Sequence, residues 1–388
     1  MIFLFSLLLI IGAEWIFLHG LIEHSLYVLA GFQGFVFIAS VGLLFFNFRR
    51  RTQNADYRLV FTYMGLFIAT GIPALVYLLP GLSYLLLGLP YLQYIGWIFS
   101  VGIFLGILYG IQFGRWNWKV HHVTISYPNL PQAFDGLRFV QISDVHVGSF
   151  LHRYHKVQKA IDLINAQDAD YVFFTGDLVN NKADEMHGWE SLFSSIQAKK
   201  GKFSILGNHD YGDYVQWNEQ DEKQANLTKL IRIHQSIGFQ PLLNDAVELG
   251  DDCWLLGVEN WGKAPFRQSG KLAETLSKVP ADAFKILLSH DPSHFDAQVL
   301  DTDIDLTLSG HTHGMQAGLQ FKNLQWSPIK YKYKHWAGLY KKGHQYLYVN
   351  RGLGWLGFPG RLGMRPEITL VELKAALIKS DLESNESR

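Results

Sequence analysis

The sequence has very little cysteine. Its single cysteine, Cys253, has no partner within the chain, so an internal disulfide is excluded, and a metal site built from several thiolates is excluded with it. Neither sign of charge is in excess, since the 388 residues contain 34 basic and 34 acidic side chains. Outside one lysine run there is no basic, aromatic-rich module, which argues against a nucleic-acid partner. Internal repeats and low-complexity segments are also missing.

Charged residues are scarce in the first 114 positions. The seven that occur there are Glu14, Glu23, Arg49, Arg50, Arg51, Asp56 and Arg58. The region contains four apolar stretches, at 2–18, 26–46, 59–79 and 92–113, each near the ~20 residues that a helix needs to cross a bilayer. We therefore expect a multi-pass membrane region of about four transmembrane helices over residues 1–114.

Two points in this region leave alternatives open. The first stretch could be a cleaved signal peptide, although no basic residue precedes it and no small-residue cleavage site follows it. The segment GLSYLLLGLP, at 81–90, is too short and too rich in Gly and Pro to cross a membrane alone. It is either an interfacial turn or the start of the fourth helix.

The arginines predict the orientation, because short loops rich in Lys and Arg stay on the cytoplasmic side. The loop NFRRRTQNADYR between the second and third stretches is such a loop, whereas HGLIEHS after the first has neither residue. Arg115 and Lys119, just past the fourth stretch, agree with this cytoplasmic assignment. We expect a protein of the cell (inner) membrane with both termini, and all that follows the fourth helix, in the cytoplasm.

Glu14 lies within the first apolar stretch, where a carboxylate is costly in lipid and marks either a functional position or a buried polar contact. Gln33 and His24 are candidate partners in such a contact. No proton-relay pattern accompanies Glu14, so the buried contact is the favoured interpretation.

From about Arg115 the pattern changes to short runs of Val, Ile and Phe between polar helical stretches, which is typical of an α/β domain. The expected strands are LRFVQIS, YVFFTG, FSILG, WLLGVE, FKILLS, DLTLS, YLYVN and EITLVEL. Residues 153–167 carry apolar side chains at helical spacing. We place this domain at 115–376 and a disordered tail at 377–388.

Polar side chains that bind metals follow five of these strands. The residues are Asp144, His146, Asp177, Asn208, His209, Asp210, His290, His311 and His313. Ligand groups in α/β proteins gather at the carboxyl ends of strands, so these side chains are expected to converge. A lone Asp or His after a strand is more often a turn former or a helix cap. Five in series, three of them with a preceding glycine, are hard to explain as turns.

Seven of these side chains are too many for one ion: Asp144, His146, Asp177, Asn208, His290, His311 and His313. Two ions sharing one carboxylate would take about four ligands each. Two metals ~3.5–4 Å apart are the arrangement that clamps the attacking and leaving oxygens of phosphoryl transfer. Imidazole with carboxylate and amide oxygen suits Mn, Fe, Zn or Co, and the sequence does not choose among them.

The ordered set Asp-x-His, Gly-Asp, Gly-Asn-His-Asp, an isolated His and Gly-His-x-His resembles the calcineurin-like metallophosphoesterase superfamily. The resemblance implies a β-sandwich flanked by helices, in α-β-β-α layers, with a binuclear metal centre at the strand ends. It implies one ion on Asp144, His146, Asp177 and His313, and the other on Asp177, Asn208, His290 and His311. It also implies that His209 contacts the substrate phosphate and assists the leaving group, with Asp210 orienting its imidazole.

The flanking motifs YVNRGLGW, PGRLGMRPEITLVEL and KHWAGLY resemble a bacterial branch with YkuE-like and YaeI-like phosphodiesterases. Similar enzymes include the membrane-associated UDP-2,3-diacylglucosamine pyrophosphatases of lipid A synthesis. This chain departs from many relatives at Asn180, where they have Asp, and at Met315, where they have Gly.

Two further segments allow more than one interpretation. The run IKYKYKHWAGLY, at 329–340, is either a basic and aromatic surface for lipid headgroups or phosphorylated substrate, or an edge strand protected by its lysines. The loop RGLGWLGFPGR, at 351–361, carries Leu353, Trp355, Leu356 and Phe358, which favours membrane or acyl-chain contact. Arg351 and Arg361 are either phosphate ligands or members of structural salt bridges.

The sequence thus predicts a membrane-anchored enzyme that hydrolyses a phosphodiester or pyrophosphate bond with two divalent metal ions (Mn, Fe or Zn). A lipid-linked substrate such as UDP-2,3-diacylglucosamine is favoured. The alternatives are a protein phosphatase, a nucleotide phosphodiesterase and a non-catalytic membrane sensor. The complete ligand set and His209 argue against the sensor.

Overall fold

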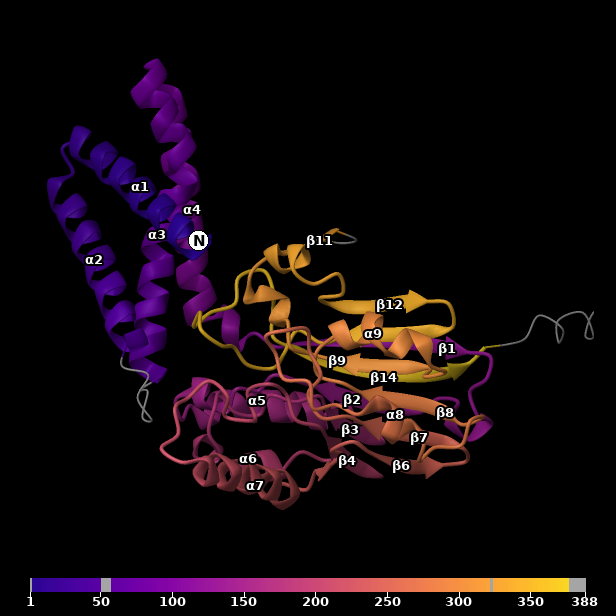
Figure 1. Cartoon of the computed structure of the whole chain (residues 1–388). Helices are drawn as coiled ribbons and strands as arrows, with labels where there is room; N and C mark the ends of the chain where they lie inside the picture. The colour runs from indigo at the N-terminus through magenta and orange to yellow at the C-terminus, as the bar shows by residue number, and fades with distance from the viewer. Residues whose placement is uncertain (1, 50–56, 322–323, 377–388) are drawn as a thin grey trace, which may run out of the picture. The chain divides into compact units, whose positions relative to one another are not determined.

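A computed structural model describes residues 2–49, 57–321 and 324–376 of the chain (Figure 1). The chain divides into two compact units: Met1–Arg115 with Leu356–Gly363, and Trp116–Trp355 with Met364–Arg388. We call the first the helical unit and the second the catalytic unit. The assignment of Leu356–Gly363 to the helical unit differs from a single boundary near residue 115. The tail at 377–388 lies outside the described residues.

The helical unit contains α1 (Ile2–Glu23), α2 (Tyr27–Arg49), α3 (Tyr57–Leu87) and α4 (Pro90–Gln112). All four are long and apolar enough to cross a membrane. These helices cover the four predicted stretches. Most of the arginine-rich loop, at 50–56, lies outside the described residues.

The segment GLSYLLLGLP is neither an interfacial turn nor the beginning of α4, apart from its last residue. Positions 81–87 continue α3, which contains Pro73 and Pro80 in its interior. Close packing accompanies the second proline, since a Cβ on Gly96 would lie 2.7 Å from the Pro80 ring. Proline is tolerated in a membrane helix when neighbouring helices pack against the site, and α4 then begins with Pro90 at its first turn.

Glu14 is buried and accepts hydrogen bonds from Gln33 Nε2 at 3.2 and 3.4 Å, which confirms the predicted contact between α1 and α2. His24 is not that partner and lies 3.2 Å from the Gln93 amide oxygen instead.

The loop Leu356–Gly363 packs against α3 and α4 and is also bound by Arg115, which lies shortly after α4. The backbone N–H of Arg361 donates to the Gly110 carbonyl at 3.2 Å, and Arg115 Nη1 donates to the Pro359 carbonyl at 2.9 Å. A Cβ on Gly65 would lie 3.0 Å from the Pro359 ring. The side chain of Arg361 is almost fully buried.

The catalytic unit contains two six-stranded sheets. The first has the order β1-β14-β2-β3-β4-β5, comprising β1 (Lys119–Tyr127), β14 (Glu367–Ala375), β2 (Arg138–Ile142), β3 (Tyr171–Phe174), β4 (Gly201–Ser204) and β5 (Gln240–Pro241). The second has the order β12-β13-β9-β8-β7-β6, comprising β12 (Gly338–Lys342), β13 (Gln345–Val349), β9 (Leu306–Ser309), β8 (Phe284–Leu288), β7 (Cys253–Gly257) and β6 (Asp245–Gly250). Strands β2, β3 and β4 are mutually parallel, as are β7, β8, β9 and β13.

Three apolar layers hold this unit together. Between the sheets, Phe139 and Phe173 of the first meet Leu255 and Ile286 of the second. The outer face of the first sheet packs on α5 (Tyr154–Asn165), α6 (Glu190–Ser194) and α7 (Gln220–Ser236). The second packs on the short helices α8 (Leu272–Leu276) and α9 (Ser293–Ala297). Figure 1 shows these elements, and the α-β-β-α sandwich predicted from the resemblance is confirmed.

The eight predicted strands and the helix at 153–167 are confirmed, with small differences at their ends. The run at 329–340 is not a continuous edge strand, because η7, a 3₁₀ turn (Pro328–Tyr331), occupies its beginning and β12 starts only at Gly338. Leu353 and Trp355 are fully buried, so these two side chains are not available to lipid. Trp355 packs against Trp116 and Phe150, with ring centroids 4.7 and 5.1 Å apart.

Candidate metal centre

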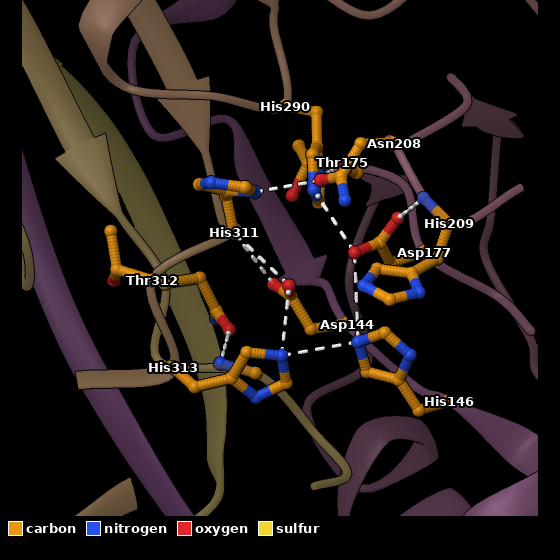
Figure 2. A network of polar contacts seen from close by, with 12 residues as sticks. Asp144, His146, Thr175, Asp177, Asn208, His209, His290, His311, Thr312 and His313 are labelled. Carbon is orange, nitrogen blue, oxygen red and sulfur yellow. Dashed lines mark hydrogen bonds and ion pairs between the residues drawn. The ribbon is translucent and has the colours of Figure 1, made fainter. Parts of the chain in front are cut away.

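The predicted site residues follow five strands whose carboxyl ends meet at one place. Asp144 and His146 follow β2, Asp177 follows β3, and Asn208 to Asp210 follow β4, all in the first sheet. His290 follows β8, and His311 and His313 follow β9, in the second sheet. Figure 2 labels all of these residues except Asp210 and shows the labelled side chains turned toward one another. The site therefore lies where the ends of both sheets come together.

The backbone is strained at this place. Five of the predicted ligands have positive φ, between 47 and 70°: Asp144, His146, Asp177, His311 and His313. This region is rarely populated by residues other than glycine, and such strain collects at functional sites. The conformation turns successive side chains toward one point just beyond the strand, which ordinary strand geometry does not do.

Asp144, His146 and His313 form the first group, all buried, with potential ligand atoms within 4.8 Å of one another. His313 Nε2 lies 3.3 Å from Asp144 Oδ1 and 3.1 Å from His146 Nε2. The Nδ1–H of His146 is directed at the Val179 carbonyl, 3.2 Å away, so its Nε2 carries a lone pair.

Asp177, His290 and His311 form the second group, also within 4.8 Å. His290 Nδ1 lies 2.7 Å from the Thr175 carbonyl, which directs its Nε2 at Asp177 Oδ2, 3.2 Å away. Asn208 belongs beside this group, since its Oδ1 is 2.7 Å from His311 Nδ1.

The donor set fits two divalent cations. Within the described residues, the buried Nε2 of His290 has no hydrogen-bond partner. The two groups divide in the same way as the two ligand sets that the resemblance implies. Carboxylate, imidazole and amide oxygen without thiolate suit a borderline or hard divalent metal.

Burial is the strongest influence on the ionisable groups, and it opposes charge. It raises the pKa of Asp144 to about 6 and lowers the pKa of His146 to about 3. Burial opposes charge on Asp177 and His290 as well, but their mutual attraction lowers the pKa of Asp177 and raises that of His290. The Asp177 carboxylate is therefore a fixed negative charge at the centre of the site.

His209 stands apart from both groups. Its Nδ1 lies 2.7 Å from the Asn180 carbonyl, and its backbone N–H donates to Asp177 Oδ1 at 2.8 Å. The expected contact with Asp210 is wrong, because the Asp210 carboxylate accepts from the backbone N–H groups of Gly207, Asp177, Leu178 and Val179. Asp210 thus joins the loops after β3 and β4, while a main-chain carbonyl orients the imidazole.

Sequence reasoning missed several residues of the site. The Tyr333 hydroxyl lies 2.8 Å from His311 Nε2, and the Tyr214 hydroxyl accepts from Asn208 Nδ2 at 2.8 Å. The Tyr214 ring lies 4.5 Å from that of His209. Tyr214 comes from a loop with no motif of its own. Tyr333 lies in the run at 329–340, for which the sequence predicted a surface or an edge strand and no contact with His311. Asp291 Oδ2 lies 3.6 Å from His311 Nε2. Among the missed residues, Asp291 could have been found from the sequence, because it directly follows the predicted ligand His290.

Arg351 is a member of a structural salt bridge. Its guanidinium pairs with Glu367 in the interior, where both side chains are almost fully buried. The Asn180 departure leaves the site intact, because its side-chain oxygen accepts from Ser149 and only its carbonyl contacts His209. Met315 has a φ of 53°, which explains why glycine suits this position.

A two-sheet sandwich with paired carboxylate and histidine groups at its strand ends defines a metal-dependent phosphoesterase. The calcineurin-like phosphoesterase family matches residues 137–315. An uncharacterized metallophosphoesterase of Bacillus subtilis, YkuE, is 33% identical over 65% of this chain and 84% of its own length. The chain belongs to the calcineurin-like phosphoesterase family.

Other relatives include membrane proteins. A transmembrane protein with a metallophosphoesterase domain from Danio rerio is 30% identical over 69% of this chain, which spans only 60% of that relative's length. Among solved structures, a dimetal phosphatase from Danio rerio aligns with 56% of this chain and 88% of its own, at 9% identity and a TM-score of 0.34. Four candidate membrane helices and such relatives make this chain a membrane protein.

Proposed function

We propose that this protein hydrolyses a phosphodiester or pyrophosphate bond of a lipid-linked substrate with two divalent metal ions. One ion would be held by Asp144, His146, Asp177 and His313, and the other by Asp177, Asn208, His290 and His311. When bound, two such ions neutralise the negative charge on the phosphoryl oxygens and lower the pKa of bound water. The reaction class is hydrolysis, with water as the attacking group.

The position of Asp177 carries the proposal. Its Oδ2 lies 3.5 Å from His146 Nε2, of the first group, and 3.2 Å from His290 Nε2, of the second. One carboxylate oxygen therefore faces an imidazole Nε2 of each group, which is the position that a ligand shared by two cations would need. A site for a single ion would not need a carboxylate in this place.

His209 would act on the substrate. The Asn180 carbonyl lies 2.7 Å from its Nδ1, so a proton on Nε2 would be the one donated to the departing oxygen. Asp210 would act as a positioning residue, because it fixes the loops of Asp177 and His209 through their backbone. Tyr333 and Tyr214 would also be positioning residues, because their hydroxyl groups contact the side chains of His311 and Asn208.

A membrane-resident substrate is supported by the helical unit, because four candidate spans keep the enzyme in the bilayer where lipids are. The resemblance to UDP-2,3-diacylglucosamine pyrophosphatases makes that compound the first substrate to test. The arginines at 49–51 support a cytoplasmic catalytic unit in an inner membrane.

The test is hydrolysis by the purified full chain with Mn²⁺. Bis(p-nitrophenyl) phosphate, p-nitrophenyl phosphate and UDP-2,3-diacylglucosamine would be compared, with Asp177→Asn as the inactive control. We expect the diester and the lipid diphosphate to be hydrolysed, with a loss of at least about 10³-fold in Asp177→Asn. Activity that survives this substitution or a chelator would contradict the two-metal site, whereas preference for the monoester would contradict only the substrate class.

Orientation is tested by fusing a reporter to the C-terminus. Green fluorescent protein fused there is expected to fluoresce, because it folds in the cytoplasm, and alkaline phosphatase is expected to be inactive because it needs disulfides. The opposite pattern would place the catalytic unit outside the cytoplasm.

A further inference from the structure

A short hairpin in the catalytic unit turns apolar side chains toward solvent. Strands β10 (Leu319–Phe321) and β11 (Leu324–Trp326) pair Leu319 with Trp326, Gln320 with Gln325, and Phe321 with Leu324. Side chains alternate along a strand, and paired residues share a face. One face therefore carries Leu319, Phe321, Leu324 and Trp326, and the other carries only Gln320 and Gln325.

The two glutamines differ, since Gln325 is exposed and Gln320 contacts the protein. With its amide oriented to satisfy the hydrogen bonds, the Gln320 oxygen accepts from Arg351 Nη2 and Nε at 3.0 and 2.9 Å. The apolar face is turned outward, where Leu319, Phe321 and Leu324 are 61%, 69% and 61% exposed. A hairpin adapted to water would have the opposite arrangement.

The exposed apolar residues of the catalytic unit gather around this hairpin. Eight large hydrophobic side chains are exposed in the described part of the unit, and five of them lie between residues 315 and 331: Met315, Leu319, Phe321, Leu324 and Tyr331. Scattered single residues need no explanation, but a concentration of this kind marks an interaction site.

The hairpin is anchored to the metal centre at both ends. His313 begins η6, a 3₁₀ turn (His313–Gln316), which precedes β10 directly, and Ser327 Oγ donates to the Gly314 carbonyl at 2.8 Å. Beyond η7, Tyr333 contacts His311. Met315, in a conformation that favours glycine, is 52% exposed between His313 and the hairpin.

The segment that contains the hairpin is basic, although Asp296 of α9 pairs with one of its lysines, Lys334, at 3.3 Å. Residues 315–335 contain no acidic residue and four lysines: Lys322, Lys330, Lys332 and Lys334. A cavity of about 230 Å³ lies beside His311, whose ring is 4.7 Å from Phe266 of the cavity wall. Its charged lining comprises three lysines and one carboxylate: Lys263, Lys332, Lys334 and Asp296. An apolar face joined through the chain to a mainly basic cavity wall at Lys332 and Lys334 matches a molecule with hydrocarbon chains and an anionic head.

We propose that the apolar face of the β10–β11 hairpin binds the acyl chains of the substrate while its phosphate occupies the metal centre. This inference rests on the proposed function and names the element that selects acylated substrates. The basic cavity takes the remaining anionic part of the headgroup. The commitment to a lipid substrate follows from the lysines, because hydrocarbon alone would not need them.

Binding is tested without turnover, by labelling a cysteine with bimane. Because Cys253 is buried, Leu324→Cys offers a single reactive thiol in the full chain. In amphipol, dihexanoylphosphatidylglycerol below its micelle concentration should shift the emission to shorter wavelength in a saturable way. Glycerophosphoglycerol, which has the same head without acyl chains, should not. A label at exposed Gln224→Cys on α7 serves as the control and should not respond.

Three results would overturn the inference. One is no shift, or an equal shift with the deacylated compound. Another is a shift that grows with protein concentration alone, which would indicate a second copy of the chain. The third is a shift on transfer into phosphatidylglycerol nanodiscs with no further change on addition of the short-chain lipid, which would indicate contact with the bilayer itself.

Kinetics supply the second test. Replacing Leu319, Phe321 and Leu324 together by serine should lower kcat/KM for UDP-2,3-diacylglucosamine at least about tenfold and leave hydrolysis of bis(p-nitrophenyl) phosphate unchanged. Gln325→Ser, on the opposite face, should change neither. Equal losses on both substrates would overturn the inference. If the natural chain hydrolyses only soluble diesters, the proposed substrate fails, and the fluorescence result still decides whether the hairpin binds acyl chains.

Discussion

At the scale of single residues, His209 is the side chain with the most specific chemical role. Its Nδ1 is bonded to the Asn180 carbonyl, and its ring lies outside both groups of predicted ligands. A residue that protonates the departing oxygen matters most when that oxygen is a poor leaving group. We expect His209→Ala to lower kcat for an alkyl phosphodiester by about 10²–10⁴-fold.

The same substitution should affect bis(p-nitrophenyl) phosphate much less, because p-nitrophenolate leaves without a proton. Steady-state rates with the two diesters, at saturating metal, measure this difference. His155→Ala, at an exposed position in α5, is the matched control. Equal losses on both diesters would show that His209 acts on binding and not on the leaving group.

His234 shows what burial does to a histidine remote from the metal centre. It is fully buried in α7, stacks on Phe174 at 5.6 Å, and has no hydrogen-bond partner at either ring nitrogen within the described residues. Burial lowers its pKa to about 4. The folded chain therefore keeps this ring neutral at pH values where the unfolded chain, with a pKa of about 6.5, protonates it.

Because the unfolded state binds the extra proton, the free energy of unfolding falls as the pH drops from about 6.5 toward 4. The full effect of this single group is about 3 kcal/mol. We expect His234→Phe to reduce the difference in Tm between pH 7.5 and pH 5. Comparing this difference within each protein removes any constant change in stability. An unchanged difference would mean that other groups dominate the acid sensitivity.

At the scale of elements, the turns after the strands decide whether the ligands converge. Gly207, between β4 and Asn208, has no room for a side chain, because a Cβ there would lie 2.6 Å from the Asp177 backbone nitrogen and also meet the Asp177 carboxylate. We expect Gly207→Ala to displace Asp177 and to lower activity at least about 10²-fold. Isothermal titration with Mn²⁺ should show weaker binding.

Gly136→Ala is the matched control. Gly136 has a φ of 83° but no atom within 4 Å of an added Cβ, so the substitution strains the backbone without touching the site. It should cost about 1 kcal/mol of stability and leave metal binding intact. If both variants bind Mn²⁺ like the natural chain, close packing at Gly207 does not hold Asp177 in place.

The elements also show what the sequence could predict. The buried strands were predictable because apolar side chains alternate with polar turns, and the site residues because each directly follows such a strand. Strands β1 and β12 are partly exposed and carry a weaker pattern. Tyr333 joins His311 only through the folded chain, across 22 positions. The apolar outer face of the hairpin was missed because alternation alone does not tell which face is turned outward.

At the scale of the whole molecule, the chain passes between its two units three times. It leaves the helical unit after Arg115, returns at Leu356, and leaves again after Gly363. Gly354, two residues before the return, donates its backbone N–H to the Asp144 carbonyl at 2.9 Å. The segment that supports a predicted metal ligand is therefore continuous with a loop held by the membrane helices.

This topology predicts the behaviour of a fragment that begins at Trp116. Without α3 and α4, the loop Leu356–Gly363 loses the hydrogen bonds to Gly110 and Arg115, and Leu362 loses its neighbour Gly106. The exposed apolar loop should make the fragment self-associate. Replacing the loop by eight residues of Gly and Ser should restore a monomer, measured by size-exclusion chromatography with light scattering, with soluble-diester activity retained within about threefold, since about 0.65 kcal/mol corresponds to that factor. If the fragment with its natural loop is already monomeric and as active, the helices do not stabilise this loop.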